Sequence, residues 1–399
     1  MRIAGIIAEY DPFHKGHAAH IAATRAENGG NTTHIVTVIS GNFTQRGDPA
    51  LISKFHRTEM ALANGADLVI ELPLPWAMAP AESFASGGIA ILNALGCVDT
   101  LSFGSECGSI TTLQRIAELP KDPSYQMILR ETLSTGIPYA AAGQAAAARI
   151  LGEDTATHLA SPNNTLAVEY IRAATAQQAN FSFYTLQRQG ALHNENTPNQ
   201  GFASASLLRR MVREDSNTQT ANYMPAEAHR ILSDALTAGH VTTHTATLEH
   251  ALLAQLRRMG EEEFRSLPWL SEGIENRLYH ASRSAETYTD LLNEVKTRRY
   301  PMARIRRILW AALLGLTDAD TTGTPPYIRI LGMNARGREI LNAASPTLPI
   351  LTRTAQLQNM DQRCQRLFQL ECTATDLHVL CMEHPLPCGT DYTQKMITK

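Results

Sequence analysis

Residues 2–17 read RIAGIIAEYDPFHKGH, and the expected fold is built outward from them. Residues 2–8 are nearly all apolar and include three isoleucines, a pattern typical of a buried β-strand. The run breaks at Pro12, and a helix is expected to start near Gly16 or His17. A buried strand, a short loop and a helix in this order predict the first unit of a parallel α/β sheet.

Four more short runs rich in β-branched or aromatic residues follow, at 33–40, 66–72, 98–104 and 181–187. Segments with helical periodicity separate them, such as 53–65 and 81–96. Strands that alternate with helices predict a parallel sheet covered on both faces. The fold class expected for this part of the chain is therefore α/β.

The pattern changes after about residue 215. The strand signals fade there, and the later segments carry a 3.6-residue apolar period with Gly or Pro at their ends. The stretch 212–225, VREDSNTQTANYMP, is polar and ends in Pro, as expected of a domain boundary. We therefore predict one α/β domain over residues 1–215 and a mainly α-helical domain over residues 224–399.

Composition sets broad limits on the class of protein. The chain has 399 residues, 44% hydrophobic and 18% charged, with a net charge of −3. These values indicate a globular protein of about two domains and exclude a fibre, a disordered tail and a polycation. The start of the chain lacks the pattern of a secretory signal, and we find no run of about 18 apolar residues. A cytoplasmic protein with no membrane partner is expected.

The chain contains six cysteines and no CxxC pair, which suggests reduced thiols. Four of them fall near His378 and His384 in the sequence: Cys364, Cys372, Cys381 and Cys388. These residues could form a zinc or iron–sulfur site, or they could be core thiols without a shared role. The wide spacings favour core thiols, so no metal site is predicted.

The loop after the first strand lies where an α/β sheet carries its ligand, outside the carboxyl ends of the strands. Gly16 lets backbone approach a ligand, and the following helix points its positive end and free N–H groups at the loop. His14 and His17 would lie above this helix end, where both can donate hydrogen bonds to phosphate oxygens. The pattern predicts a phosphate site; the alternative is two surface histidines beside a simple turn.

A second phosphate signal lies at 202–210, FASASLLRR, after the fifth strand. Ser204 suits an N-cap, Ser206 falls in the first helical turn, and Arg209 lies one turn further on. Hydroxyls, free backbone N–H groups and an arginine together suit phosphate. Two such helix starts in one domain predict a nucleoside triphosphate held between them.

One segment further downstream is strongly basic. Residues 296–309, KTRRYPMARIRRIL, hold six cations and no acid. Such a run is either a solvated helix face or a contact for the phosphate backbone of a nucleic acid.

These motifs bear a resemblance to a known superfamily. HKGH at 14–17 and ASASLLR at 203–209 resemble the HxGH and ISSTxxR motifs of HIGH-type nucleotidyltransferases. The resemblance implies a Rossmann-like fold and attack on the α-phosphate of a nucleoside triphosphate with release of pyrophosphate. The phosphate motifs alone would equally suit an enzyme that transfers AMP or CMP to a phosphorylated metabolite. A non-catalytic RNA-binding protein that has kept a nucleotide fold is a third interpretation.

Further stretches resemble the successive signatures of bacterial tRNA(Met) cytidine acetate ligases, at 8–17, 40–62, 65–73, 103–106, 161–170 and 296–309. The resemblance implies an ATP-dependent ligase that forms acetyl-adenylate and acetylates the wobble cytidine of elongator tRNA(Met) to N4-acetylcytidine. ATP, acetate and this tRNA are the implied substrates, and Mg²⁺ is expected with ATP. The helical half with its basic segment favours this family over a small-molecule nucleotidyltransferase.

The resemblance also implies residue roles. His14, His17 and Arg209 are the expected catalytic residues, and Arg298, Arg299, Arg304, Arg306 and Arg307 are expected to bind tRNA. The expected ATP-binding residues are Ile7, Ala8, Glu9, Tyr10, Asp11, Pro12, Phe13, His14, Lys15, Gly16, His17, Ala18, Ala19, His20, Gly104, Asn164, Arg188, Gln189, Ser204 and Ser206.

Two residues of the first loop depart from the family pattern. Asp11 stands where Asn is expected, and it would repel a triphosphate unless it faces away or helps hold a metal. Lys15 stands where Asn is common and would compensate. The loop 40–47, SGNFTQRG, is expected to line an acetate pocket, and Lys54 and Arg57 offer further cations at a helix start.

Overall fold

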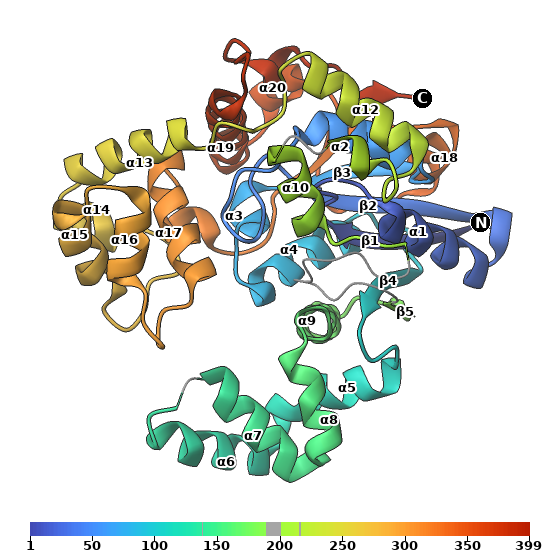
Figure 1. The fold of residues 1–399 in the computed structure, drawn as a ribbon. Helices are drawn as coiled ribbons and strands as arrows, with labels where there is room; N and C mark the ends of the chain where they lie inside the picture. Colours follow the sequence, from blue (N-terminus) through green and yellow to red (C-terminus); the bar gives the residue numbers. More distant parts are fainter. Residues whose placement is uncertain (138, 189–200, 215–216) are drawn as a thin grey trace.

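The computed structural model describes residues 1–137, 139–188, 201–214 and 217–399. An eight-stranded sheet runs through its centre in the order β5-β4-β1-β2-β3-β6-β7, with β8 paired to β6 (Figure 1). The first five strands are parallel neighbours: β1 Arg2–Ala8, β2 Thr33–Ser40, β3 Leu68–Leu72, β4 Thr100–Ser105 and β5 Ser182–Gln187. Each matches a predicted strand to within two residues, so the α/β fold class is confirmed.

Alternate residues along the strands pack into two apolar clusters, one on each face of the sheet. Ile6 and Ile39 join the cluster that contains residues of α1 (Lys15–Glu27) and α2 (Lys54–Ala63). Ile7 and Val38 join the cluster that contains residues of α4 (Ala81–Ala94) and α9 (Pro162–Ala176). This period of two explains why both faces of the sheet are covered by helices.

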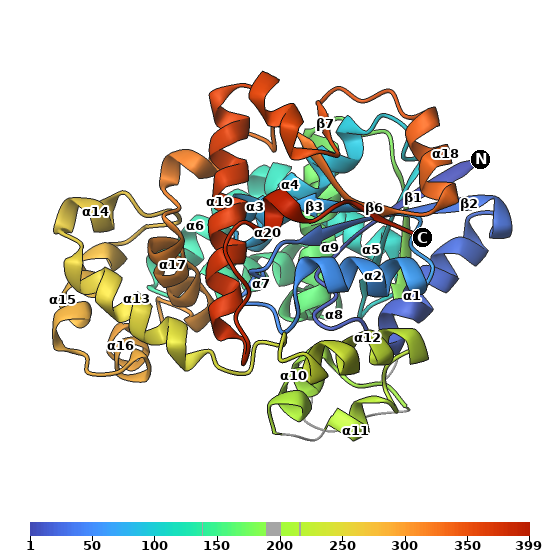
Figure 2. The same cartoon turned by 90° about the horizontal axis from the view of Figure 1, so that it is seen from above.

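The other helices lie outside these two layers. Two groups of helices project from the sheet in Figure 1, one formed by α5 to α8 and one by α13 to α17, and Figure 2 shows the second group beside α19. None of the helices in the described ranges has the length and apolar character needed to cross a membrane. The remaining helices are α3 Leu74–Ala77, α5 Ile110–Glu118, α6 Pro123–Ser134, α7 Tyr139–Leu151, α8 Glu153–Thr157, α10 Ala205–Arg213, α11 Asn217–Thr220, α12 Ala226–Thr237, α13 Ala246–Arg258, α14 Glu261–Arg265, α15 Ile274–Ser284, α16 Tyr288–Val295, α17 Met302–Leu314, α18 Ala335–Ala343, α19 Gln362–His378 and α20 Thr390–Thr393.

The sheet does not end with the N-terminal half of the chain. Strand β6 (Ile328–Met333) pairs antiparallel with β3, and β7 (Ile350–Leu351) and β8 (Ile397–Thr398) pair parallel with β6. The expectation that strands fade after about residue 215 therefore missed three strands. The segment 224–399 is mainly helical as predicted, but it also completes the sheet, and the division into two domains stays a prediction.

Candidate active site

Two histidines mark the start of α1, at the carboxyl end of β1. His14 is the N-cap, and its Nδ1 accepts a hydrogen bond from the Gly16 N–H at 3.1 Å. The Nδ1 of His17 accepts from the His14 N–H at 3.2 Å, so the two imidazoles form a reciprocal capping box. Their rings stack with centroids 3.6 Å apart and an interplanar angle of 18°. The backbone of the helix start thus holds both rings in place.

This capping arrangement determines the protonation of the two rings. Because each Nδ1 accepts a backbone N–H, the proton of the neutral ring lies on Nε2 and can be donated to a ligand. Burial and the nearby Arg188 and Arg209 lower the pKa of His14 to about 3. Burial and the adjacent His14 lower the pKa of His17 well below its usual range. Both rings are therefore neutral hydrogen-bond donors at neutral pH, rather than cations.

Gly16 and Tyr10 both pack against the two imidazole rings. A Cβ atom at Gly16 would lie 2.9 Å from Cε1 and 3.0 Å from Nδ1 of His14, so glycine leaves room for the imidazole. Tyr10 adopts a left-handed backbone conformation with φ 54, unusual for a large residue. Its ring packs edge-on against His17, with centroids 4.9 Å apart. The loop is shaped around the histidines on two sides.

The second predicted helix start faces this loop. Ser204 is the N-cap of α10, and its Oγ accepts from the Leu207 N–H at 3.1 Å, as predicted. Arg209 donates to the carbonyl oxygen of Asp11 at 2.6 Å and to Ser206 Oγ at 3.2 Å. The structure therefore brings both helix starts together, with Arg209 bridging them.

The structure also settles the position of the two departures from the family pattern. Asp11 is buried, its Oδ1 accepts from the Leu51 N–H at 2.7 Å, and its Oδ2 lies 3.4 Å from Arg209. Its charge is thus partnered within the protein. Lys15 Nζ donates to the Asn222 carbonyl oxygen at 2.7 Å, which directs this cation away from the cavity described next.

A cavity of about 420 Å³ lies between the two helix starts, hereafter the first cavity. A volume of this size suits a nucleotide-sized ligand. Its lining contains most of the predicted ATP-binding and catalytic residues: Ile7, Ala8, Glu9, Tyr10, Asp11, His14, Gly16, His17, Ala19, His20, Gly104, Arg188, Ser204, Ser206 and Arg209. Pro12, Phe13, Lys15, Ala18 and Asn164 are not part of the lining, and Gln189 lies outside the described residues.

Another part of the lining comes from β4, α9 and the end of β5. Gly104 lies on β4 and Arg188 directly follows β5. Burial lowers the pKa of Arg188, while Glu106 opposes that change. Asn164 is buried behind the lining, where its Oδ1 accepts from the backbone N–H groups of Glu106 and Cys107 at 2.9 and 3.1 Å. Asn163, its neighbour in the same motif, lines the cavity instead.

Sequence reasoning missed several apolar lining residues, namely Phe84, Phe103, Leu166 and Tyr170. They come from α4, β4 and α9. The sequence around them predicted a helix or a strand but gave no sign that these side chains line a cavity. The motif at 161–170 offered one usable signal, since Leu166 and Tyr170 are four residues apart and share a helix face. From the predicted acetate loop, Gln45 and Arg46 do line the cavity.

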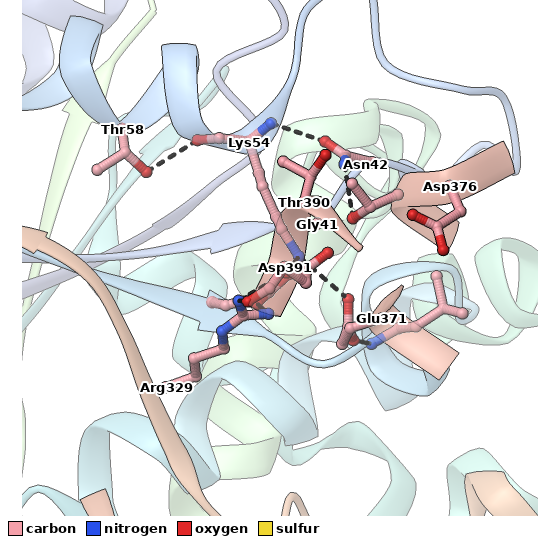
Figure 3. A network of polar contacts seen from close by, with 12 residues as sticks. Gly41, Asn42, Lys54, Thr58, Arg329, Glu371, Asp376, Thr390 and Asp391 are labelled. Carbon is pink, nitrogen blue, oxygen red and sulfur yellow. Dashed lines mark hydrogen bonds and ion pairs between the residues drawn. The ribbon is translucent and has the colours of Figure 1, made fainter. Parts of the chain in front are cut away.

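Lys54 and Arg57 do not serve the cavity as cations. Lys54 is fully buried and lies 2.6 Å from Glu71. Asp391 lies 2.7 Å from the same ammonium group (Figure 3). Arg329 lies 2.7 Å from Glu71 and 2.6 Å from Asp391. Burial and the nearby Glu71 raise the pKa of Glu371 well above its usual range, which favours its uncharged form. Two cations thus face two carboxylates, and we call these five residues the buried charge network.

Arg57 has a separate structural task beside this network. Its guanidinium donates to the carbonyl oxygens of Glu9, Ser40 and Gly41, and of Ile52 within its own segment. Glu9 and Gly41 begin the loops that follow β1 and β2, and Ser40 is the last residue of β2. Arg57 therefore ties together the two loops that carry Glu9 and Gln45 into the first cavity.

The basic segment lies against the same loop. Arg307 donates to the Gln45 carbonyl oxygen at 3.2 Å, and Arg306 lies 3.0 Å from Asp48. Arg304 donates to carbonyl oxygens of Trp269 and Ser271, whereas Arg298 and Arg299 are exposed. The segment thus supports the site loop with part of its arginines, and its contact with tRNA stays a prediction.

The C-terminal cysteines take ordinary positions. Cys364, Cys372 and Cys381 are buried and Cys388 is exposed. Among the described residues, no group of three or more His, Cys, Asp or Glu side chains has a metal-binding arrangement.

Comparison with known proteins places this site in a family. A sequence model of the HIGH Nucleotidyl Transferase family matches residues 1–390. The chain is 36% identical to the tRNA(Met) cytidine acetate ligase of Acetivibrio thermocellus and 34% identical to that of Caldanaerobacter subterraneus, covering 100% and 96% of each chain.

Solved structures agree with these relatives. The apo crystal structure of Thermotoga maritima TmcAL matches with a TM-score of 0.93 at 31% identity, covering 100% of this chain and 99% of that one. A structure of TmcAL bound with alpha-thio ATP matches with a TM-score of 0.91 at the same identity and coverage. The chain therefore belongs to the HIGH nucleotidyltransferase family and, within it, to the tRNA(Met) cytidine acetate ligases.

Proposed function

We propose that this protein activates acetate with ATP as acetyl-adenylate and transfers the acetyl group to the wobble cytidine of elongator tRNA(Met), forming N4-acetylcytidine. The observation that carries the proposal is the first cavity, where two imidazole donors, two helix starts and Arg209 meet. The names of the relatives and the ATP analogue bound by TmcAL support the same substrates.

In the first step, an acetate oxygen attacks the α-phosphorus of ATP and the bond to pyrophosphate breaks. Negative charge then increases on the equatorial and leaving oxygens. The Nε2–H groups of His14 and His17, the N–H groups of both helix starts and Arg209 would donate to these oxygens. Loss of one such donor typically slows a reaction by about 10²–10³-fold.

The expected Mg²⁺ ion would come with the nucleotide. Because no cluster of three candidate ligands occurs among the described residues, the triphosphate itself would supply most of the oxygen ligands. Mg²⁺ would neutralise part of the triphosphate charge, and the side chains named above would orient the phosphates.

Exposed arginines of the basic segment are proposed to contact the tRNA backbone. Arg298 and Arg299 are the better test, since Arg304 and Arg307 hold internal contacts whose loss would also disturb the site loop. Replacing both exposed residues with Ala should weaken tRNA binding and reduce the slope of its salt dependence. Acetate-dependent pyrophosphate exchange without tRNA should stay near the wild-type rate.

The decisive experiment is to incubate the protein with ATP, acetate and total bacterial tRNA. We expect acetylcytidine in the tRNA by nucleoside mass spectrometry, and none when acetate or ATP is omitted. Absence of acetylcytidine from the complete reaction would refute the proposal. Equal activation of acetate, propionate and butyrate would instead indicate a general acyl-activating enzyme.

A further inference from the structure

A second cavity adjoins the first. It has a volume of about 400 Å³, similar to the about 420 Å³ of the first. The two share a wall formed by Glu9 and Asp11 after β1, Arg46 after β2, and Ser206 and Arg209 on α10. A group that reacts at this wall can therefore be reached from both cavities.

The shared wall lies at the phosphate end of the first cavity. Arg209 and Ser206 belong to the helix start that faces His14 and His17, and Arg188, which directly follows β5, lies near the same two histidines. A nucleotide whose phosphates contact these donors would place its reacting phosphate beside the second cavity. Direct transfer from an acyl-adenylate requires the acceptor to bind within reach of that phosphate.

The lining of the second cavity indicates what kind of acceptor fits. Among the described residues that form it, only Pro49 lacks a polar side chain. Five arginines contribute to it alongside four carboxylates: Arg46, Arg209, Arg210, Arg213 and Arg306 with Glu9, Asp11, Asp48 and Glu214. Arginines around a polar pocket suit a base with a flanking phosphate and disfavour an acyl chain.

We propose that the second cavity binds the acceptor cytidine with its flanking phosphate, and that Glu9 accepts the proton released by the cytosine amine. This inference rests on the proposed function. The amine nitrogen would attack the acetyl carbonyl carbon, forming the C–N bond. The C–O bond to the adenylate phosphate breaks, AMP leaves with its electron pair, and the amine proton passes to the Glu9 carboxylate.

Glu9 has the position and the chemistry for this role. It lies half-buried on the shared wall, and its Oε1 accepts from the Gln45 N–H at 2.7 Å, which orients the carboxylate. Arg57 holds the backbone of the same residue through its carbonyl oxygen at 2.6 Å. Burial raises the pKa of Glu9, which makes its carboxylate a stronger base than an exposed one.

The acceptor site is tested with Arg213→Glu, because Arg213 is exposed and lines only the second cavity. The matched control is Arg338→Glu, an exposed arginine on α18. The RNA probe is an anticodon stem-loop with cytidine at the wobble position, and transfer of labelled acetate to it is measured. We expect Arg213→Glu to raise the KM for this RNA about tenfold or more. Acetate-dependent pyrophosphate exchange without RNA, and both activities of the control, should stay within about twofold of wild type.

Three different results would count against the proposed acceptor site or against the proposed function on which it rests. Normal RNA transfer by Arg213→Glu would place the acceptor elsewhere. A parallel loss of pyrophosphate exchange would make the second cavity part of the ATP site. If wild-type protein supports exchange but acetylates no RNA, the proposed function itself fails.

The role of Glu9 is tested with Glu9→Gln and chemically prepared acetyl-adenylate, which bypasses the first step. General-base catalysis contributes about 10²–10⁴-fold, so transfer to the stem-loop should slow by at least about 10²-fold. Wild-type transfer should rise with pH as Glu9 loses its proton, and the variant should lack this rise. Transfer at the wild-type rate would rule out Glu9 as the proton acceptor.

Discussion

The buried charge network and the first cavity both gather charged side chains away from solvent, but they differ in how the charges are matched. In the network, Lys54 and Arg329 each contact Glu71 and Asp391, and burial raises the pKa of Glu371. In the first cavity, three arginines and three imidazoles gather around two helix starts. The network is complete without a ligand, whereas the cavity offers its donors to an anion. The comparison separates charge used for structure from charge used for binding.

The largest effect is expected from breaking the network with Lys54→Met. This change leaves Glu71 and Asp391 buried with Arg329 as their remaining cation. Removal of one partner from a buried ion pair typically costs about 3–5 kcal/mol of unfolding free energy. Chemical denaturation should show a loss of this size, whereas the exposed control Lys121→Met should change stability by less than about 0.5 kcal/mol. A loss below about 1 kcal/mol for Lys54→Met would contradict the structural role. The isosteric Asp391→Asn tests the same network if Lys54→Met fails to fold.

Substitutions of the two histidines in the first cavity should change the rate of pyrophosphate exchange more than the stability of the fold. His14→Ala or His17→Ala removes one Nε2–H donor and should slow acetate-dependent pyrophosphate exchange by about 10²–10³-fold. The control His250→Ala changes an exposed histidine on α13 and should leave exchange unchanged. Exchange within about threefold of wild type in both cavity variants would exclude the two rings from the reaction.

Gly16→Ala tests the first cavity in a different way, because it moves the His14 ring by steric contact and removes no hydrogen-bond donor. The new methyl group would lie 2.9 Å from His14 Cε1 and would displace the ring. We expect about a tenfold loss of exchange, while unfolding free energy changes by less than about 1 kcal/mol because Ala favours helix. At Gly260, the N-cap of α14, the nearest atom to a new Cβ is 3.8 Å away, so Gly260→Ala should leave exchange normal. Equal behaviour of the two variants would argue against the steric explanation.

A separate test of the first cavity is the dependence of stability on pH. Burial lowers the pKa of His14 to about 3, of His20 to about 4 and of His378 to about 3. Between these values and about 6.5, the unfolded chain takes up protons that the folded protein does not. The contribution of these buried neutral histidines to the unfolding free energy is therefore complete above about pH 6.5 and is lost as the pH falls. Once the pH is well below 6.5, each of these histidines lowers the unfolding free energy by about 1.4 kcal/mol for every further pH unit. Denaturation of His14→Ala between pH 7.5 and 5 should show a shallower slope than wild type, and an identical slope would refute the assignment.

The sequence predicted the five parallel strands and the starts of α1 and α10 because each depends on local signals. An apolar run, a glycine or an N-cap serine is visible within a few residues, as at Gly16 and Ser204. The partners of Lys54 were not predictable in this way, since Glu371 and Asp391 lie more than 300 residues further along the chain. Strand β6 was missed because it is a short apolar run among helical patterns. Asn163 and Asn164 are adjacent in one motif, and only the packing of α9 shows which of them reaches the cavity.

The pairing of β3 with β6 also has a consequence for folding. Glu71 and Arg329 meet across 258 residues of chain, whereas β1 and β2 are joined by a single helical crossover. The entropy of closing a loop rises by about 0.6 kcal/mol for each doubling of its length, and distant contacts slow folding. The β1–β2–β3 unit is therefore expected to form first during synthesis. Until residues 328–333 arrive, the outer edge of β3 presents unpaired N–H and C=O groups to other chains, so aggregation should be most severe at this stage.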